Sequence, residues 1–205
     1  MKQRGFTLVE LLIVIGIIII LSGILLPVLI GAGKKADQTK AKAEITTLVN
    51  AIKQFESTYG VLPVPNGAGE ALTDAEYTQL ILILQAEDTA DDASSTALDD
   101  PANTTKNSRE IKFLDVVGNK RGVYLDPWDS NYTVYLDTDY NGQITTVPNG
   151  ISLPAGVTTL YYSVVVWSTG PDATSSSTAK DKSNRDNVYS FSTSWSKASG
   201  HSIDR

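Results

Sequence analysis

Residues 11–30 read LLIVIGIIIILSGILLPVLI, and this uncharged stretch decides the fold of the N-terminal part of the chain. As an α-helix that rises ~1.5 Å per residue, it would cover ~30 Å, the thickness of the hydrocarbon core of a bilayer. The apolar core of a secretory signal peptide is shorter, at ~7–15 residues. The stretch therefore predicts a transmembrane helix, and a simple membrane anchor is the plainest interpretation of it.

The residues before this stretch carry a more specific signal. The segment MKQRG at residues 1–5 is short and basic and ends in glycine, and Phe6 follows it. A single carboxylate, Glu10, lies directly before the apolar run. A carboxylate near the membrane interior costs ~2.5–3.5 kcal/mol on insertion scales, so Glu10 is a candidate for function.

The stretch GFTLVELL at residues 5–12 resembles the cleavage and methylation signal of type IV prepilins and type II secretion pseudopilins. The resemblance implies that residues 1–5 are a prepilin leader peptide, which a prepilin peptidase removes between Gly5 and Phe6. It implies that the new amino group of Phe6 is N-methylated. It also implies that Glu10 pairs with the Phe6 ammonium group of a neighbouring subunit in a filament, where an unpaired buried charge is costly.

Apolar residues continue at helical spacing after the uncharged stretch, which is typical of one buried face of a helix. Gly60 and Pro63 then indicate its end. We therefore expect one long helix, with residues 6–33 as the transmembrane and filament-core half and residues 34–59 as an amphipathic half that packs on a sheet. The apolar positions of the second half are Ala41, Ile45, Leu48, Ile52, Phe55 and Tyr59.

Residues 34–205 as a whole predict a globular domain that contains the second half of the long helix. Thr73 and Glu76 form a capping-box pattern, which predicts a short helix at about residues 74–86. Residues 86–108 are acidic and rich in Ser and Thr without aromatic residues, which is typical of an exposed loop.

The region 111–195 contains runs rich in β-branched and aromatic residues, separated by Asn, Gly and Pro turn signals. It predicts a small antiparallel β-sheet, and residues 196–205 predict a loose C-terminal tail. The fold class is therefore α+β, with a long N-terminal helix packed on a small sheet, as in the pilin-like fold. The expected strands are 111–117, 122–125, 132–136, 157–167 and 188–195.

Two further segments are similar to the major, G-type pseudopilins. YLDPWDSNY at residues 124–132 resembles that group's D-P-W-G-N-P-Y segment, but residues 129–131 depart from it. STGPD at residues 168–172 resembles its S-x-G-P-D-G…D-D-I segment. Here Ala173 replaces the last Gly, Asn187 replaces the second Asp, and the intervening loop is longer.

The loop from residue 168 to residue 187 offers oxygen ligands of the kind that calcium prefers. Because the loop joins two expected strands, Asp172 near its start and Asp186 near its end should come together, and their charges repel unless a cation neutralises them. The resemblance implies calcium, which G-type pseudopilins bind in the matching loop. We expect Asp172, Asp186 and Asn187 to hold it with backbone carbonyls; the alternative is a flexible Ser-rich loop.

A second acidic pattern, DTDYNG at residues 137–142, begins like an EF-hand calcium loop. The twelfth position of such a loop should be a bidentate Glu, but here it is Pro148. Asn141 and Gly142 instead predict a hairpin turn.

The composition excludes several classes of function. The formal charge of −6, from 17 Lys and Arg against 23 Asp and Glu, argues against a nucleic-acid partner. The chain has no Cys and a single His, His201, so only carboxylate chemistry remains for an enzyme. Asp126 and Asp137 would be the pair to consider, but nothing in the sequence sets their separation. We therefore expect no enzyme.

The resulting hypothesis is a structural subunit of a helical filament, a pseudopilin of a type II protein secretion system. A main subunit of a type IV pilus, or a minor pilin that binds a ligand as an adhesin, is the alternative. The implied partners are other copies of the chain, the prepilin peptidase, other pseudopilins and the inner-membrane assembly platform. The chain would wait as a single-pass inner-membrane protein with its C-terminal domain in the periplasm, before entering a periplasmic pseudopilus or surface filament.

Overall fold

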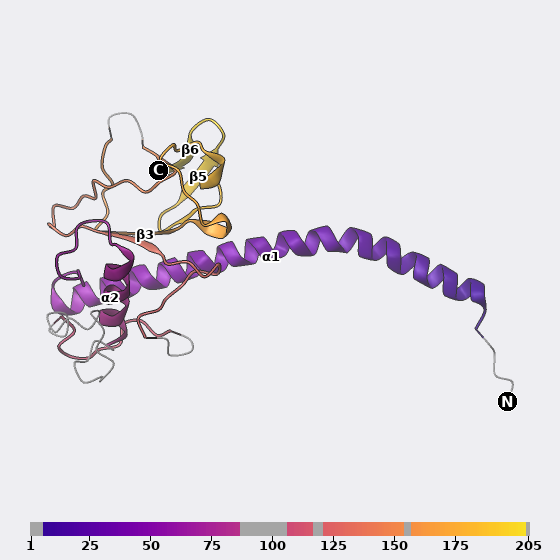
Figure 1. Cartoon of the computed structure of the whole chain (residues 1–205), viewed down its shortest axis with the longest axis horizontal. Helices are drawn as coiled ribbons and strands as arrows, with labels where there is room; N and C mark the ends of the chain where they lie inside the picture. The colour runs from indigo at the N-terminus through magenta and orange to yellow at the C-terminus, as the bar shows by residue number, and fades with distance from the viewer. Residues whose placement is uncertain (1–5, 87–105, 117–120, 154–156, 204–205) are drawn as a thin grey trace. The chain divides into compact units, whose positions relative to one another are not determined.

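The computed structural model describes residues 6–86, 106–116, 121–153 and 157–203, with the backbone alone for residues 25–31. The chain divides into two compact units, Met1–Thr39 and Lys40–Arg205. Helix α1, Leu8–Tyr59, contributes to both units (Figure 1). Its 52 residues confirm the expected single helix over residues 6–59, with a start two residues later than expected.

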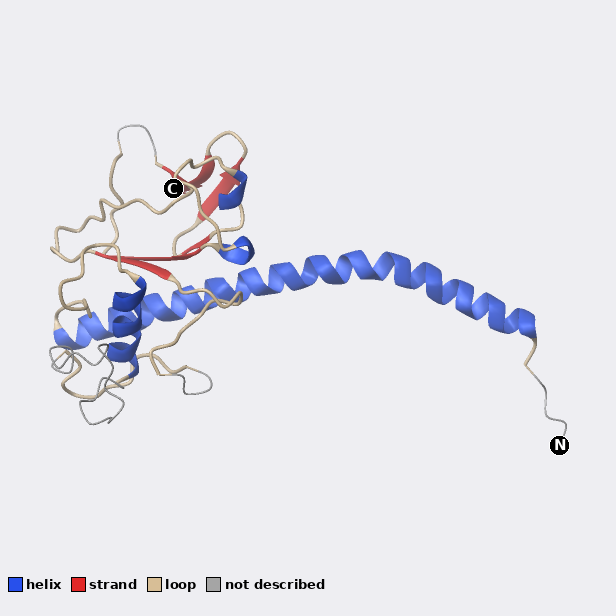
Figure 2. Cartoon of the chain, in the orientation of Figure 1, coloured by secondary structure: helices blue, strands red, loops and turns tan. Residues whose placement is uncertain are grey.

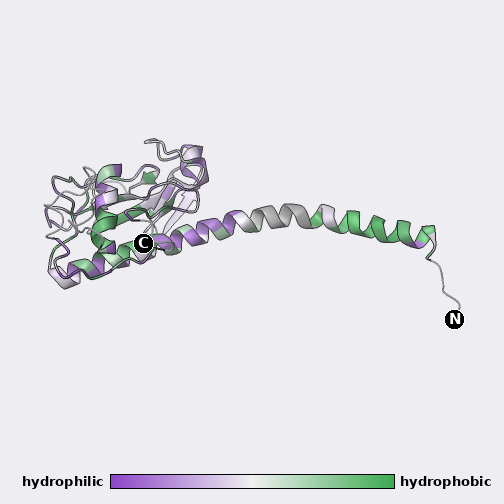
Figure 3. Cartoon of the chain, turned by 60° about the horizontal axis from the view of Figure 1, so that its bottom comes forward, coloured by the Kyte–Doolittle hydropathy of each residue, from purple (hydrophilic) through white to green (hydrophobic). Residues whose placement is uncertain are grey.

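The first unit consists of the N-terminal part of α1. Large apolar side chains from Leu8 to Ile24 are exposed there, and Figure 3 shows the corresponding hydrophobic colour along this part of the helix. Within the described residues, no helix meets the length and hydropathy required of a membrane span. The transmembrane assignment of residues 6–33 is therefore not confirmed by the structure.

In the second unit, the predicted apolar face of α1 is buried as expected. Ala41, Ile45, Leu48 and Ile52 are fully buried and Phe55 is 1% exposed, whereas Tyr59 is only partly buried at the edge of the core. Polar groups also attach this helix to the rest of the unit, since the ammonium group of Lys42 donates to the backbone carbonyls of Tyr189 and Phe191. Burial lowers the pKa of Lys42.

Helix α2, Asp74–Gln85, confirms the short helix expected at residues 74–86. Thr73 caps its first turn and exchanges hydrogen bonds with Glu76, so both sides of the capping box are present. Ala86 ends the helix in the left-handed conformation, with φ of 56°. The apolar face of α2 joins the same core as α1 through buried side chains that include Tyr77, Leu80 and Leu84.

A three-stranded antiparallel sheet covers this helical layer. It contains β1 (Thr133–Leu136), β3 (Val164–Ser168) and β4 (Val188–Tyr189) in the order β1-β3-β4. Val134, Leu136, Val164 and Val166 enter the core with the helices. Alternate residues of the same strands, Tyr135, Val165 and Trp167, enter a second core. The sheet is thus buried on both faces, which explains its nearly unbroken apolar strands.

The second core lies beneath another three-stranded sheet, visible with the first in Figure 2. This sheet contains β2 (Ile151–Ser152), β5 (Thr193–Ser196) and β6 (Gly200–Ile203), in the order β2-β6-β5. Its β2–β6 pair is parallel. The expected antiparallel sheet is the sheet β1-β3-β4, and this second sheet was not expected. The expectation of a loose tail at residues 196–205 is wrong, because β6 is the central strand of the second sheet.

Other expected strands are also corrected. Residues 111–116 form no strand, because the amides of Phe113 and Leu114 donate to the carbonyl of Leu84 at the end of α2. Residues 122–125 contribute only a bridge between Leu125 and Asn131, and in the run 157–167 only the last residues belong to β3. The acidic loop expected at 86–108 lies largely outside the described residues.

Candidate functional site

The first candidate site is the start of α1, where Glu10 caps its own helix. Its carboxylate Oε2 accepts hydrogen bonds from the backbone N–H of Thr7 at 2.9 Å and from the Thr7 hydroxyl at 2.7 Å. The amide of Glu10 in turn donates to Thr7 Oγ1 at 3.3 Å. This is a reciprocal capping box, so the charge has local partners within one chain.

Sequence reasoning missed this role of Thr7, although the pattern Thr-x-x-Glu before an apolar run is the signal that identified Thr73 and Glu76. Phe6 is 73% exposed beside it. Gly5, the residue expected before the cleaved bond, lies outside the described residues. Glu10 thus lies in the first turn of α1, four residues after the chain position expected to become the new N-terminus.

The second candidate site is the loop between β3 and β4, whose ends meet as expected. Ser168 pairs with Val188, and Trp167 with Tyr189, so the loop closes between two hydrogen-bonded strands. Gly170 has φ of +74° and begins the short helix η1, Gly170–Asp172. A Cβ atom at Gly170 would lie 2.6 Å from the carbonyl oxygen of Asp186, so glycine is required by both conformation and contact.

Asp172 and Asp186 are close enough for their charges to interact. Burial raises the pKa of Asp186, and the negative charge of Asp172 raises it further, against hydrogen bonds from backbone N–H groups and the charge of Arg185. Asp172 is more exposed, and its Oδ1 accepts from the amide of Thr174 at 2.9 Å. The ionised form of Asp186 is therefore disfavoured in the folded chain, and a bound cation would relieve this cost.

The side-chain amide of Asn187 shows whether this residue has an oxygen free to bind a cation. Its side-chain amide group donates to Tyr189 Oη at 3.1 Å and to Asn184 Oδ1 at 3.4 Å, which fixes the orientation of the amide. Its Oδ1 is buried and has no hydrogen-bond partner. This orphaned oxygen belongs to the residue directly after Asp186, and an oxygen ligand fits the all-oxygen ligand set of calcium.

The described residues contain no group of three or more Asp, Glu, His or Cys side chains placed to hold a metal. A calcium site here would therefore use the two carboxylates, the Asn187 oxygen and backbone carbonyls. Asp181, another acidic residue of the loop, instead caps the short helix η2, Lys182–Asn184, by accepting from the amide of Ser183.

The acidic pattern at residues 137–142 forms a turn. Asp137 is 3% exposed, and its two carboxylate oxygens accept from the amides of Asn141 at 3.1 Å and Gly142 at 2.8 Å. The expected turn is confirmed, but the hairpin is wrong, because β1 pairs with β3 and the following Ile144 pairs with Leu160. Asp137 has a structural task in this turn.

Asp126, the other residue of the carboxylate pair considered for catalysis, also accepts hydrogen bonds within the fold. It is 4% exposed, and its Oδ1 accepts from the amides of Trp128 and Ser130. Its Oδ2 accepts from the Ser168 hydroxyl at 2.6 Å. The sequence offered the D-P-W segment as a resemblance but not this contact with the start of the β3–β4 loop.

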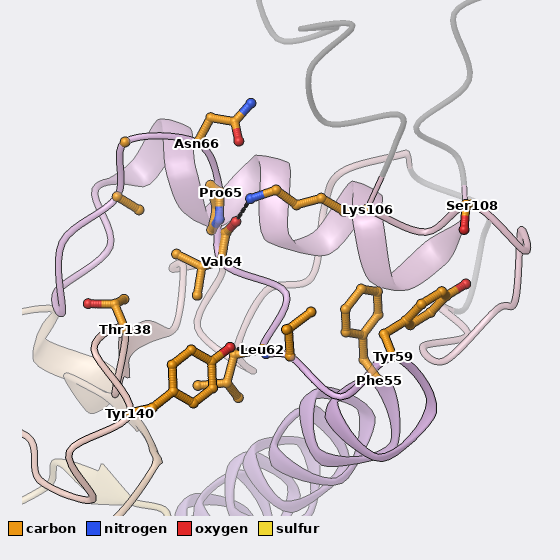
Figure 4. Close-up of a pocket in the computed structure, with 13 residues that line it drawn as sticks. Phe55, Tyr59, Leu62, Val64, Pro65, Asn66, Lys106, Ser108, Thr138 and Tyr140 are labelled. Atoms are coloured by element: carbon orange, nitrogen blue, oxygen red, sulfur yellow. Dashed lines mark hydrogen bonds between the residues drawn. The ribbon is translucent and has the colours of Figure 1, made fainter.

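A hollow of about 690 Å³ opens between the end of α1 and the segment that follows it (Figure 4). Phe55, Tyr59, Leu62 and Tyr140 form much of its wall, and the ammonium group of Lys106 donates to the carbonyl of Val64. Burial lowers the pKa of Lys106. The described residues that line it supply no carboxylate or imidazole beside this amine, so they form no acid–base pair.

Parts of this chain resemble a known family model and several known proteins. Residues 1–26 match the family model of the prokaryotic N-terminal methylation motif. The chain is 40% identical over 74 residues to core protein G of the type II secretion system of Escherichia coli, which is 36% of this chain and 51% of that protein. It is 41% identical over 71 residues to core protein G of Vibrio cholerae, or 35% of this chain and 49% of that protein.

A third relative is the type IV wide pilus major component PilA4 of Thermus thermophilus, 43% identical over 60 residues, or 29% of this chain and 43% of that protein. No solved structure matches the chain. The chain spans about half the length of the curated relatives it matches. The chain therefore carries the prokaryotic N-terminal methylation motif at residues 1–26 and is similar, over about a third of its length, to core protein G of type II secretion systems.

Proposed function

We propose that this chain is a non-catalytic structural subunit of a helical filament, the pseudopilus of a type II protein secretion system. The observation that carries the proposal is the methylation motif at residues 1–26, together with similarity to core protein G in several species. A prepilin peptidase would cut between Gly5 and Phe6. Before assembly the chain would be held in the inner membrane, with its globular unit in the periplasm.

The exposed apolar side chains of the first unit support assembly. The large apolar side chains from Leu8 to Ile24 remain 46% or more exposed, so they lack full cover within one chain. Lipid or the helices of other subunits would supply that cover, and small residues such as Gly16 and Gly23 permit close helix contacts. During assembly, Glu10 would exchange or share its Thr7 contacts with the Phe6 ammonium group of a neighbour.

We further propose that the β3–β4 loop binds calcium through Asp172, Asp186 and Asn187. The convergence of the two carboxylates, the raised pKa of Asp186 and the orphaned Asn187 oxygen support this site. Calcium would supply positive charge between two repelling carboxylates. An ion that binds only the folded chain stabilises it by ~2.7 kcal/mol at a concentration one hundred times Kd.

A main subunit of a type IV pilus is the second candidate. The match to the Thermus pilus component favours it, at an identity comparable to that of the secretion proteins but over a shorter stretch. Both candidates require the same processing and the same helical core.

Mass spectrometry of the mature protein tests the proposal. We expect an N-terminus at N-methylated Phe6, because residues 1–5 are removed by the peptidase. Gly5→Trp should leave the leader attached, since a bulky side chain would not fit at the cleaved bond, whereas Gln3→Ala should be processed normally. A mature chain that begins after Gly31 or Gly33 would identify an ordinary signal sequence instead.

A further inference from the structure

The buried carboxylate of Asp126 is stabilised by hydrogen bonds. The ion pairs recorded among the described residues are Lys40–Glu44 and Lys53–Glu56, both on α1. The charge of Asp126 is instead stabilised by three donors, the amides of Trp128 at 3.0 Å and Ser130 at 2.8 Å, and the Ser168 hydroxyl at 2.6 Å. Hydrogen bonds to an ionised acceptor are short and about twice as strong as neutral ones.

The Ser168 hydroxyl links the Asp126 carboxylate to the β3–β4 loop through hydrogen bonds. Ser168 is fully buried, and its Oγ accepts from the amide of Gly170 at 3.0 Å. Because its proton is directed to Asp126, a lone pair of the hydroxyl is left for the Gly170 N–H. The carboxylate thereby sets the direction of a two-bond chain that ends at the first residue of η1.

Gly170, the first residue of η1, packs closely against Asp186. A Cβ atom there would lie 3.3 Å from the carboxyl carbon of Asp186, as well as against its backbone. Any shift of Gly170 would therefore move the start of the loop relative to Asp186, and Asp172 lies only two residues further along η1. The hydrogen-bonded chain from Asp126 therefore ends at the residue that packs against Asp186, two residues before Asp172.

We propose that Asp126 is a positioning residue for the calcium loop, which it holds in the ligand-ready arrangement through Ser168 and Gly170. The inference rests on the proposed calcium site. Asp126 does not touch the ion in this assignment. It joins the turn at residues 126–130 to the loop entrance, so two distant segments of the chain determine one binding geometry.

Calcium titration of the full-length chain in detergent micelles tests this role, with the dissociation constant measured by calorimetry. Asp126→Asn keeps the shape but reverses the polarity of the contact with Ser168. We expect its affinity for calcium to fall by about tenfold, the change produced by 1.4 kcal/mol. Ser168→Ala, which removes only the hydroxyl, should show a similar loss, and the double variant should lose little more than either single one.

Asp137→Asn is the matched control, because Asp137 is an equally buried carboxylate that binds two backbone amides in a turn away from this loop. We expect it to lower the melting temperature in EDTA without changing calcium affinity. Wild-type affinity in both Asp126→Asn and Ser168→Ala would overturn the positioning role. A wild-type chain that binds no calcium would overturn the calcium site itself, and this role of Asp126 with it. If Asp126→Asn fails to fold, Ser168→Ala alone decides.

Discussion

At the scale of single residues, the two candidate sites hold carboxylates in opposite circumstances. Glu10 receives a backbone N–H and a hydroxyl from Thr7, so its charge is well accommodated in one chain. Asp186 is partly buried beside Asp172, and its pKa is raised. The charge of Glu10 thus has hydrogen-bond partners within one chain, whereas the charged form of Asp186 is disfavoured in the folded chain.

Asp186→Asn should raise the melting temperature of the calcium-free chain at pH 7 and abolish its response to calcium. The folded pKa of Asp186 lies above its ordinary value of 3.8, so its contribution to stability falls as pH rises through the folded pKa. At neutral pH the charged form therefore costs stability, and the amide removes that cost. Thermal melts in EDTA and in calcium measure both effects, with Asp137→Ala as a control that keeps the calcium response. A lower melting temperature for Asp186→Asn in EDTA would contradict the argument.

Glu10→Leu should insert in the membrane at least as well as the native chain but assemble poorly. Insertion improves because a charge is removed, and assembly fails because the Phe6 ammonium group lacks a partner. Glu10→Gln is the discriminating variant, since its amide oxygen can still accept from Thr7 without carrying charge. We expect both variants to give a low yield of sheared filaments at normal cellular levels of the protein. Wild-type yield from Glu10→Gln would mean that Glu10 acts only as a helix cap.

At the scale of elements, α2 depends on its capping box because it is short. Thr73→Ala removes the hydroxyl from the first turn and should cost about 1 kcal/mol, which lowers the melting temperature by about 2–4 °C in a chain of this size. Thermal denaturation followed by circular dichroism measures the loss. Thr46→Ala is the control, because Thr46 is an exposed residue inside α1 whose hydroxyl donates to the carbonyl of Lys42. An equal loss in both variants would show that the cap has no special role.

The helices could be predicted from the sequence because their signals are local. The spacing of Ile45, Leu48 and Ile52 identified the buried face of α1, and the pattern at Thr73 identified the start of α2. The strands were harder to predict, because pairing depends on partners far along the chain. Residues 111–116 have strand-like composition, yet their amides find the carbonyl of Leu84 instead of a neighbouring strand.

The candidate sites also contain features that local sequence predicts and features that depend on distant residues. The motif at residues 5–12 could be read directly, and the meeting of Asp172 with Asp186 followed once β3 and β4 were expected to pair. The contact between Asp126 and Ser168 joins residues 42 positions apart, so no local sequence pattern predicts it. The burial of His201 was missed for the same reason, since it depends on the pairing of β6 with β2.

At the scale of the whole molecule, the globular unit contains a buried imidazole that makes its stability depend on pH. His201 is 6% exposed, with Nε2 2.9 Å from the carbonyl oxygen of Asn184 and Nδ1 3.1 Å from the Thr193 hydroxyl. Burial lowers its pKa from the ordinary 6.5. Below about pH 6.5 the unfolded chain therefore binds more protons than the folded chain, and stability falls as the pH decreases.

His201→Gln should reduce this acid sensitivity, because glutamine retains a donor and an acceptor but cannot be protonated. We expect the melting temperature of the native chain to fall between pH 7.5 and pH 5.5 by more than that of the variant. The comparison between the two chains cancels the opposite contribution of Asp186, whose raised pKa favours the folded chain as the pH decreases. Parallel pH profiles for the native chain and the variant would contradict the prediction.

The central position of β6 affects the order in which the globular unit can form as the chain emerges during synthesis or export. β2 and β5 do not pair with each other; each pairs with β6, which follows both in the sequence. Until β6 arrives, the inner edges of both strands lack their hydrogen-bonding partners, and such edges favour pairing with other chains. The chain is therefore most prone to aggregate before Gly200–Ile203 pairs in the sheet, and a chaperone would be most useful at that stage.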